Sequence, residues 1–215
     1  MKMYSTVIWD LDGTLLYTLV DLMNSVNYSM RTLGYEERSL EDIRMFVGNG
    51  VKKLVELAIP DGRDNPDYKK AYDLFCEYYS EHNLDNTVPY DGVVEVIEEL
   101  RRRGVKQAIV SNKIDSAVKK LNKTFFGVDI ALGVTDSLPR KPAPDMVWKA
   151  MVELGADIST TVYVGDSEVD LKTAKNSKLD CISVLWGFRN LDEISPYDPM
   201  CTVENPKDIL RFITK

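Results

Sequence analysis

The stretch Thr6-Val7-Ile8-Trp9 leads directly into Asp10-Leu11-Asp12-Gly13-Thr14, so a short and largely apolar run ends in two carboxylates and a turn. The run lacks the alternation of a half-exposed strand and is typical of a parallel strand that is buried on both faces. Three later runs are of the same kind: Gln107–Val110, Val162–Val164 and Cys181–Leu185. The four runs predict a parallel sheet with helices on both faces.

Helical patterns separate these strands. Asp91–Arg103 places its apolar residues on one side and ends in arginines and a glycine, which suit the last turn of a helix. Further patterns cover Asp145–Leu154 and Asp170–Ser177. Because strands and helices alternate, we expect a three-layer, doubly wound α/β fold.

The segment from Tyr17 to Asn86 differs, since it contains helical patterns and no convincing strand. We expect helices near Leu19–Leu33, Ser39–Phe46, Val51–Ile59 and Asp67–Glu81, with Ser39 and Asp42 forming a capping box. The predicted domains are therefore a catalytic core, residues 1–16 and 87–215, and an inserted helical cap domain, residues 17–86.

Composition and net charge exclude several classes of function. The 215 residues carry a net charge of −7, have no membrane-length apolar run and include a single histidine, His82. We therefore expect a cytoplasmic protein that does not bind nucleic acid or a membrane and whose chemistry uses carboxylates and lysines. Three cysteines predict neither a disulfide framework nor a zinc site. The sequence leaves open whether the protein is a monomer or a homodimer.

Polar residues follow three of the predicted strands. They are Asp10–Thr14, Ser111-Asn112-Lys113, and Gly165-Asp166-Ser167 with Asp170 close behind. In an open parallel sheet the ligand lies outside the carboxyl ends of the strands, so these segments are expected to converge. Lys141, in a proline-rich segment before a helix, joins them.

This set of residues suits phosphoryl transfer. Oxygen atoms from Asp10, Asp166 and a main-chain carbonyl near Asp12 would form a hard site of the kind that Mg²⁺ prefers. Asp10 could attack phosphorus to give an aspartyl-phosphate, while Asp12 exchanges protons with the leaving group and with water. Thr14, Ser111 and Lys141 would bind the phosphate oxygens.

At these residues the chain resembles the haloacid dehalogenase superfamily. Asp10-x-Asp12-Gly-Thr14 matches its first motif, Ser111 its second, Lys141 its third and Gly165-Asp166-x-x-x-Asp170 its fourth. The resemblance implies a Rossmann-like core, a C1 cap, a magnesium ion, Asp10 as nucleophile and Asp12 as acid and base. Finer features, including Val47-Gly48-Asn49-Gly50 and Lys141-Pro142-Ala143-Pro144, resemble the phosphoglycolate phosphatase branch.

The predicted site has two parts. The metal ligands are Asp10, Asp12, Asp166 and Asp170, and the substrate and phosphate ligands are Thr14, Ser111, Asn112, Lys141, Gly48 and Lys52. Gly48 also reads as a simple break between helices, and Lys52 as part of a polar helix face. The chain departs from many such relatives at Tyr17-Thr18, where they carry Asp-Ser or Asp-Thr, and Thr18 is expected to cap the first helix.

The predicted partner is a small phosphorylated metabolite, hydrolysed in the manner of a phosphoglycolate phosphatase. Alternatives within the same branch are an inorganic pyrophosphatase and a β-phosphoglucomutase. An alternative of another class is a Mg²⁺-binding signalling module that accepts phosphate on Asp10, although the helical insertion favours an enzyme that must exclude water. A dehalogenase would not need Asp12.

Overall fold

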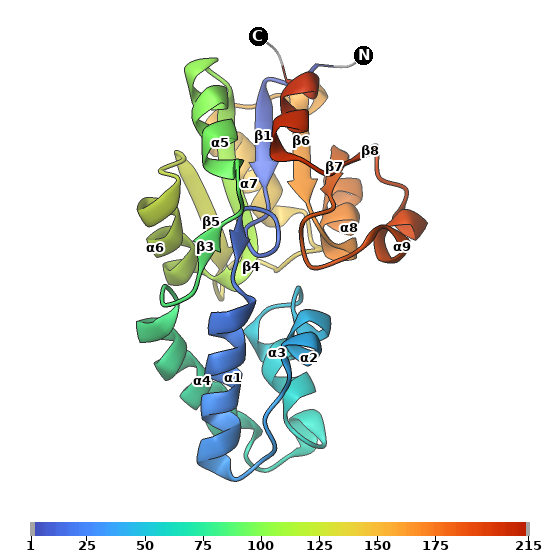
Figure 1. Ribbon diagram of the computed structural model, residues 1–215. Coiled ribbons are helices and arrows are strands. Elements are labelled where there is room, and N and C mark those ends of the chain that lie inside the picture. Colours follow the sequence, from blue (N-terminus) through green and yellow to red (C-terminus); the bar gives the residue numbers. More distant parts are fainter. Residues whose placement is uncertain (1–2, 214–215) are drawn as a thin grey trace. The chain divides into compact units, whose positions relative to one another are not determined.

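The computed structural model describes residues 3–213 and divides the chain into two compact units (Figure 1). The first unit comprises Met1–Leu16 and Pro89–Lys215, and the second comprises Tyr17–Val88. Residues 1–2 and 214–215, which the sequence analysis counted with the core, lie outside the described residues.

The first unit is built on a six-stranded sheet in which all neighbouring strands pair in parallel. The strands, in spatial order, are β5 (Ile130–Val134), β4 (Lys106–Ile114), β1 (Thr6–Trp9), β6 (Thr161–Gly165), β7 (Asp180–Val184) and β8 (Cys201–Val203). Strand β1 lies between β4 and β6, with Trp9 opposite Ile109 and Val164. The predicted doubly wound α/β fold is confirmed.

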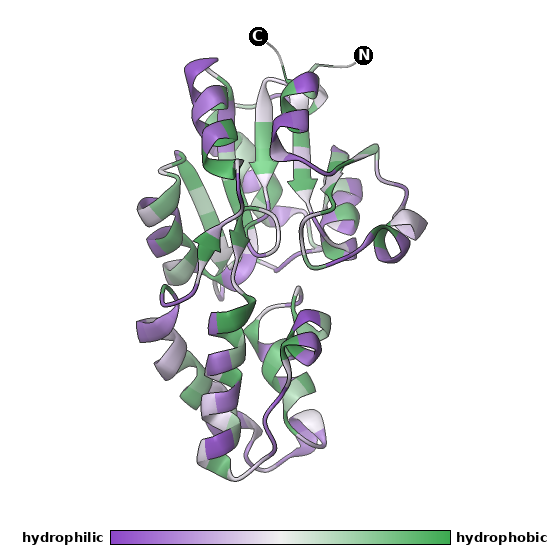
Figure 2. Ribbon diagram, viewed as in Figure 1, coloured by the Kyte–Doolittle hydropathy of each residue, from purple (hydrophilic) through white to green (hydrophobic). Residues whose placement is uncertain are grey.

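Helices lie on both faces of this sheet. They are α5 (Val93–Arg102), α6 (Asp115–Phe125), α7 (Asp145–Leu154), α8 (Glu168–Ser177) and α9 (Leu191–Ile194), with 3₁₀ turns η2 (Ile158–Thr160), η3 (Ser195–Tyr197) and η4 (Pro206–Phe212). In Figure 1, α5 and η4 lie on one face while α7 lies on the other. Figure 2 shows the strands as mostly hydrophobic and the helices as hydrophilic on part of their surface, as expected when both sheet faces are covered.

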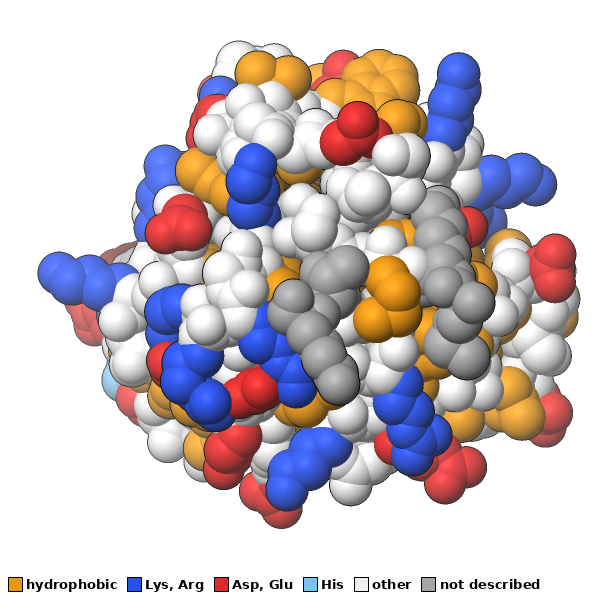
Figure 3. All heavy atoms as spheres, turned by 90° about the horizontal axis from the view of Figure 1, so that it is seen from above, with side chains coloured by type: hydrophobic (Ala, Val, Ile, Leu, Met, Phe, Trp, Pro, Cys, Tyr) orange, Lys and Arg blue, Asp and Glu red, His pale blue; other side chains and the backbone are white. Residues whose placement is uncertain are grey.

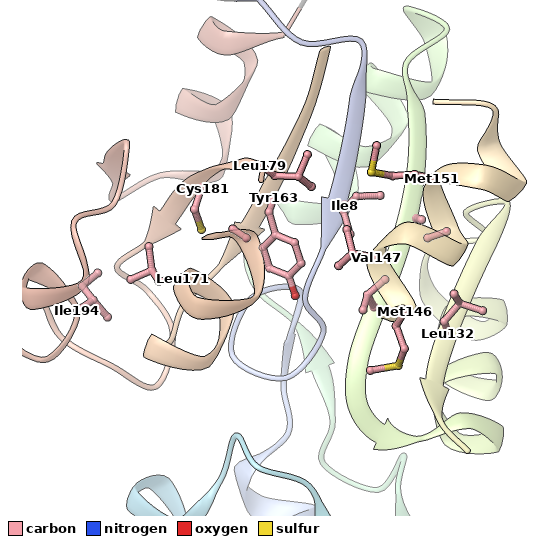
Figure 4. Packing of buried hydrophobic residues seen from close by; sticks show 14 residues of the cluster. Ile8, Leu132, Met146, Val147, Met151, Tyr163, Leu171, Leu179, Cys181 and Ile194 are labelled. Carbon is pink, nitrogen blue, oxygen red and sulfur yellow. The ribbon is translucent and has the colours of Figure 1, made fainter. Parts of the chain in front are cut away.

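Apolar side chains fill the layer between the sheet and helices α7 and α8 (Figure 4). Tyr163 of β6 lies in this cluster near Ile8 of β1 and Cys181 of β7, and all three are buried. The Tyr163 hydroxyl stands at the end of the ring remote from Leu179 (Figure 4). One edge of an apolar layer therefore carries a polar group toward the carboxyl ends of the strands.

The core differs from the sequence expectation in strand β4 and in several unpredicted elements, which include α9 and β8. Strand β4 continues through Ser111, Asn112 and Lys113, which were expected to follow the strand. Helix α6 and strand β5 were not predicted. Helix α6 is amphipathic, but only Ala117, Val118 and Leu121 are buried on its apolar side, and β5 is a short strand that contains Gly133, so both are easily overlooked in the sequence.

The second unit is helical, as predicted. Its helices are α1 (Leu19–Leu33), α2 (Leu40–Phe46), α3 (Val51–Ala58) and α4 (Tyr68–His82), with a 3₁₀ turn η1 (Gly62–Asp64). The predicted capping box of Ser39 and Asp42 is confirmed. The chain passes between the units through β2 (Leu16–Tyr17) and β3 (Val88–Pro89), which pair with each other.

The expectation that the Thr18 side chain caps α1 is wrong. Thr18 occupies the N-cap position, but its side chain makes no capping hydrogen bond. Its hydroxyl oxygen is buried and has no hydrogen-bond partner among the described residues. The helix is held at this end by a different residue.

That residue is Asp21, in the first turn of α1, which is buried and accepts hydrogen bonds from the segment that leads back toward β3. The donors are the main-chain N–H and side-chain amide of Asn86 and the main-chain N–H and hydroxyl of Thr87, at 2.8–3.1 Å. The carboxylate thus ties the entry and exit of the helical unit together.

Charged groups on the surface pair locally. At the end of α5, Arg101 pairs with Glu98, and Arg102 and Arg103 pair with Glu99. Figure 3 shows basic and acidic side chains interspersed over one face of the molecule. None of the helices within residues 3–213 combines the length and the apolarity that crossing a bilayer requires.

Replacing Asp21 with alanine is expected to lower the free energy of unfolding by about 3 kcal/mol, because the buried amide and hydroxyl donors lose a charged acceptor. Urea denaturation measures the change. Asp73→Ala is the matched control, since Asp73 lies on the exposed face of α4 in an ion pair with Lys69 and its loss should cost under about 0.5 kcal/mol. Equal effects of the two substitutions would contradict the role given to Asp21.

Candidate active site

The site begins where adjacent strands end. Asp10 directly follows β1, and its N–H donates to the carbonyl of Val164 in β6 at 2.9 Å. Asp166 directly follows β6. Because β1 and β6 are parallel neighbours, the two carboxylates come to the same edge of the sheet although 156 positions separate them in the sequence.

A third carboxylate joins them. Ligand oxygens of Asp10, Asp166 and Asp170 all lie within 4.8 Å of one another, and all three residues are buried. These are three of the four predicted metal ligands. The fourth, Asp12, was predicted to offer a main-chain carbonyl, and that contribution stays a prediction; its side chain pairs with Lys113.

Lys141 inserts its ammonium among these acids. Its Nζ lies 2.6 Å from Asp10 Oδ1, 2.8 Å from Asp170 Oδ1 and 3.0 Å from the Tyr163 hydroxyl. An ammonium has three protons, so these three contacts can use all of them. Lys141 is therefore in direct contact with the candidate nucleophile.

Asn112 fixes the main chain of Lys141. Its side-chain oxygen accepts from the Lys141 N–H at 2.8 Å, and its amide nitrogen donates to the Lys141 carbonyl at 3.0 Å. Asn112 was predicted to bind phosphate, but the structure directs both ends of its amide to the backbone of Lys141. The reason is the length of β4, which carries Asn112 alongside the Lys141 segment.

Tyr163 is the residue that the sequence analysis missed. Its hydroxyl oxygen accepts a hydrogen bond from Lys141 Nζ, and its O–H donates to Asp170 Oδ1 at 3.1 Å. The available signal was a tyrosine in the otherwise aliphatic run before Gly165-Asp166, because a buried tyrosine usually needs a partner for its hydroxyl.

The two oxygens of the Asp170 carboxylate make different sets of contacts. Its Oδ2 accepts from the N–H and the hydroxyl of Ser167, which begins helix α8, while its Oδ1 meets Lys141 and Tyr163. Asp170 thus takes part in the capping box of α8 and also contacts the lysine.

Asp166 is held on both oxygens. Thr14 donates its hydroxyl to Oδ1 at 3.1 Å, and the main-chain N–H of Phe188 donates to Oδ2 at 2.8 Å. A Cβ on Gly187 would lie 2.3 Å from the Cβ of Asp166, so only glycine allows this approach. The Thr14 hydroxyl bonds to Asp166, and that Thr14 also binds phosphate stays a prediction.

The two remaining strand residues lie beside this group. The Ser111 hydroxyl accepts from the N–H of Lys113 at 3.2 Å, and both residues are buried. Lys113 extends to Asp12, with 2.7 Å between Nζ and Oδ1. Lys113 is therefore a buried lysine in direct contact with a candidate catalytic acid.

The family model for the haloacid dehalogenase-like hydrolases matches residues 7–184. The chain belongs to this family. A phosphoglycolate phosphatase of Pseudomonas putida is 32% identical over 216 residues, covering 95% of this chain and 78% of that protein. One of Aquifex aeolicus is 28% identical, covering 96% and 95%.

A solved structure is also similar. A protein from Lactobacillus delbrueckii, provisionally assigned as a phosphoglycolate phosphatase, superposes with a TM-score of 0.91 at 32% identity over the whole of both chains. These relatives indicate that this haloacid dehalogenase-like hydrolase is an enzyme of the phosphatase type.

In this hydrolase the buried carboxylates carry more negative charge than Lys141 can balance. Burial and the neighbouring Asp170 raise the pKa of Asp10 well above its ordinary value, although Lys141 opposes the shift. Burial and Asp170 also raise the pKa of Asp166 to about 7. Burial lowers the pKa of Lys141, but Asp10 and Asp170 outweigh it, so that this pKa is raised and the ammonium keeps its charge.

The residues present fit a divalent metal. Three oxygen-bearing acids in a buried cluster are hard ligands, and the excess negative charge would be relieved by a cation. Cations of the Mg²⁺ type prefer such oxygen ligands and keep waters and a phosphate in their remaining positions. The cluster is compatible with that chemistry.

The two predicted cap residues belong to the other unit. Gly48 lies between α2 and α3 with a φ of 120°, and Lys52 lies in the first turn of α3, where it is exposed. The conformation of Gly48 suits its interpretation as a break between helices. That either residue binds substrate stays a prediction.

The raised pKa of Asp166 predicts a pH-dependent stability. Because the folded metal-free protein holds this proton up to about pH 7 and the unfolded chain releases it near about pH 4, the free energy of unfolding should fall as the pH rises between these values. Asp166→Asn removes this titrating group and should make the slope shallower, while Asp10, whose pKa is also raised, still contributes to it. Urea denaturation in EDTA at several pH values tests it, and equal slopes for the two proteins would contradict the assignment.

Proposed function

We propose that this protein is a Mg²⁺-dependent phosphatase that hydrolyses a small phosphorylated metabolite, in the manner of a phosphoglycolate phosphatase, through an aspartyl-phosphate. The observation that carries the proposal is the contact between the Lys141 ammonium and the Asp10 carboxylate within a buried group of acids. The similarity to proteins named phosphoglycolate phosphatase supports the substrate class.

Asp10 is the proposed nucleophile. It is fixed at the end of β1 by its own N–H and by Lys141, so one carboxylate is oriented before substrate arrives. A carboxylate oxygen attacks phosphorus, the bond from phosphorus to the leaving oxygen breaks, and the aspartyl-phosphate forms. Lys141 stays against Asp10 and stabilises the charge that develops on the phosphoryl oxygens.

Asp12 is the proposed acid and base. It gives its proton to the leaving oxygen as the first bond breaks, and it takes a proton from the water that then attacks phosphorus. Breaking the bond between phosphorus and Asp10 releases inorganic phosphate and restores the free carboxylate. The Asp12 side chain is partly exposed, at 18%, which allows contact with substrate and water.

Asp10 and Asp166, with Asp170 behind them, would hold the metal. When bound, a Mg²⁺ ion supplies positive charge that lessens the repulsion between the phosphate and the nucleophilic carboxylate. Thr14, Phe188 and Ser167 keep the acids in place through the hydrogen bonds described above. The protein therefore contributes a rigid set of oxygens rather than a flexible one.

Phosphate binding falls to Ser111 and Lys141 in this proposal, while Thr14 and Asn112 act as positioning residues. The helical unit, residues 17–88, is the proposed cap, and Gly48 and Lys52 would contact the part of the substrate remote from the phosphate. A cap of this kind excludes water during the first step and sets which metabolites fit.

The test is phosphate release from 2-phosphoglycolate, pyrophosphate, β-glucose 1-phosphate and common sugar phosphates, with and without Mg²⁺. We expect 2-phosphoglycolate to be hydrolysed fastest, EDTA to stop turnover, and Asp10→Asn to reduce it by at least roughly 1,000-fold.

Asp208→Asn is the control, because Asp208 forms an ion pair with Arg211 away from the acid cluster and should leave turnover unchanged. Full activity of Asp10→Asn would exclude Asp10 as nucleophile. Preferred hydrolysis of pyrophosphate, or isomerisation of β-glucose 1-phosphate, would replace the proposed substrate class.

A further inference from the structure

The ion pair between Lys113 and Asp12 stands apart from the contacts that hold the acid cluster. The Lys113 side chain is 2% exposed and that of Asp12 is 18% exposed, and 2.7 Å separates Nζ from Oδ1. The ammonium therefore stands behind the carboxylate as seen from solvent. A substrate that reaches Asp12 does not need to touch Lys113.

The backbone of Lys113 is fixed on both sides. Its N–H donates to the Ser111 hydroxyl within β4 at 3.2 Å. A Cβ on Gly133 of β5 would lie 2.7 Å from the Lys113 carbonyl oxygen and 2.5 Å from the Asp115 Cα, so the missing side chain lets β5 approach this segment closely. The Gly133 N–H also donates to Asp115 Oδ1 at 3.0 Å. The ammonium is thus carried by an anchored strand.

Burying an ammonium is unfavourable unless it is paired with an anion. The anion that pairs with Lys113 is the Asp12 carboxylate. Lys113 belongs to β4, whereas Asp12 follows β1. The contact between them therefore lets one strand restrain a side chain that follows another. Asp12 is therefore held at its side chain as well as through its main chain, which bridges to Leu16.

We propose that Lys113 is a positioning residue for proton transfer, acting through Asp12; the inference rests on the proposed function. In the first step, Asp12 gives the leaving oxygen the proton that it took from the attacking water of the preceding turnover: the O–H bond on Asp12 breaks, a new O–H bond forms on the leaving group, and Asp12 returns to the carboxylate that pairs with Lys113. Lys113 already touches this carboxylate and stabilises the charge as it appears. It also keeps the carboxylate oriented for the return of a proton from water.

The effect should depend on the leaving group. An alkyl phosphate such as 2-phosphoglycolate needs a proton on its leaving oxygen, whereas 4-nitrophenyl phosphate leaves as a stable anion and needs little help. Single-turnover release of the leaving group isolates this step from the later hydrolysis. A purely structural role of Lys113 would slow both substrates equally.

The experiment compares Lys113→Met with wild type in the full-length protein with Mg²⁺. We expect release from 2-phosphoglycolate to slow by roughly 100-fold and release from 4-nitrophenyl phosphate by less than about 5-fold. Equal losses for the two substrates, or no loss for either, would overturn the proposal. Lys119→Met is the matched control, since Lys119 lies on the exposed side of α6 and pairs with Asp115.

A double-mutant cycle shows whether Lys113 acts through Asp12. In an Asp12→Asn background, Lys113→Met should change release from 2-phosphoglycolate by less than about 2-fold, because the acid is already absent. A further 100-fold loss would instead give Lys113 a role of its own. Asp12→Asn by itself tests the proposed function, so a fully active single variant would refute that function rather than this inference alone.

Lys113→Gln guards against a folding defect. It removes the charge but keeps a hydrogen-bond donor near Asp12, and thermal unfolding of all variants shows whether the fold is intact. We expect Lys113→Gln, like Lys113→Met, to slow release from 2-phosphoglycolate more than release from 4-nitrophenyl phosphate, but by a smaller factor. A folded Lys113→Gln protein without that dependence would overturn the proposal.

Discussion

The buried ammonium of Lys141 is the interaction on which the site depends. It touches Asp10 and Asp170 while Asp166 lies in the same cluster, so acids that would repel one another in an apolar interior are partly neutralised. Holding the ammonium there requires partners for its protons and a fixed backbone. Tyr163 supplies the first from the apolar layer, and Asn112 supplies the second from β4. The packing of the sheet therefore determines how the charges of the site are balanced.

Each acid at this edge is restrained by a segment other than its own. Asp166 is held by Thr14 and by the loop after β7, and Asp12 is held by Lys113 of β4. Such cross-contacts place carboxylates where their oxygens can act together, and they make the positions insensitive to fluctuations of any one loop. The same arrangement lets a helical unit be inserted after β1, because its two connections, β2 and β3, pair with each other and Asp21 secures its entry to its exit.

Prediction from the sequence succeeded where a pattern was local. The strand at Thr6–Trp9 and the helices at Leu19–Leu33 and Asp145–Leu154 have the predicted ends, since their apolar periods and their glycine or polar boundaries are clear. It failed at α6, which has few large apolar residues, at β5, which is short and contains Gly133, and at Thr18, whose residue type favours a cap that its side chain does not make. Capping preferences describe a residue type, and packing decides the individual case.

The sequence by itself determined the fold class, the helical insertion and the family, because four spaced motifs and a short apolar run before Asp10 are properties of order along the chain. It also identified Asp10, Lys141 and Asp166 as residues that would meet at the carboxyl edge of the sheet. Only the tertiary structure decided what each side chain touches. Thr14 and Asn112 bind protein groups, Tyr163 joins Lys141, and Lys113 stands behind Asp12, because these contacts join strands and loops far apart in the sequence and arise only when the sheet order brings them within hydrogen-bonding distance.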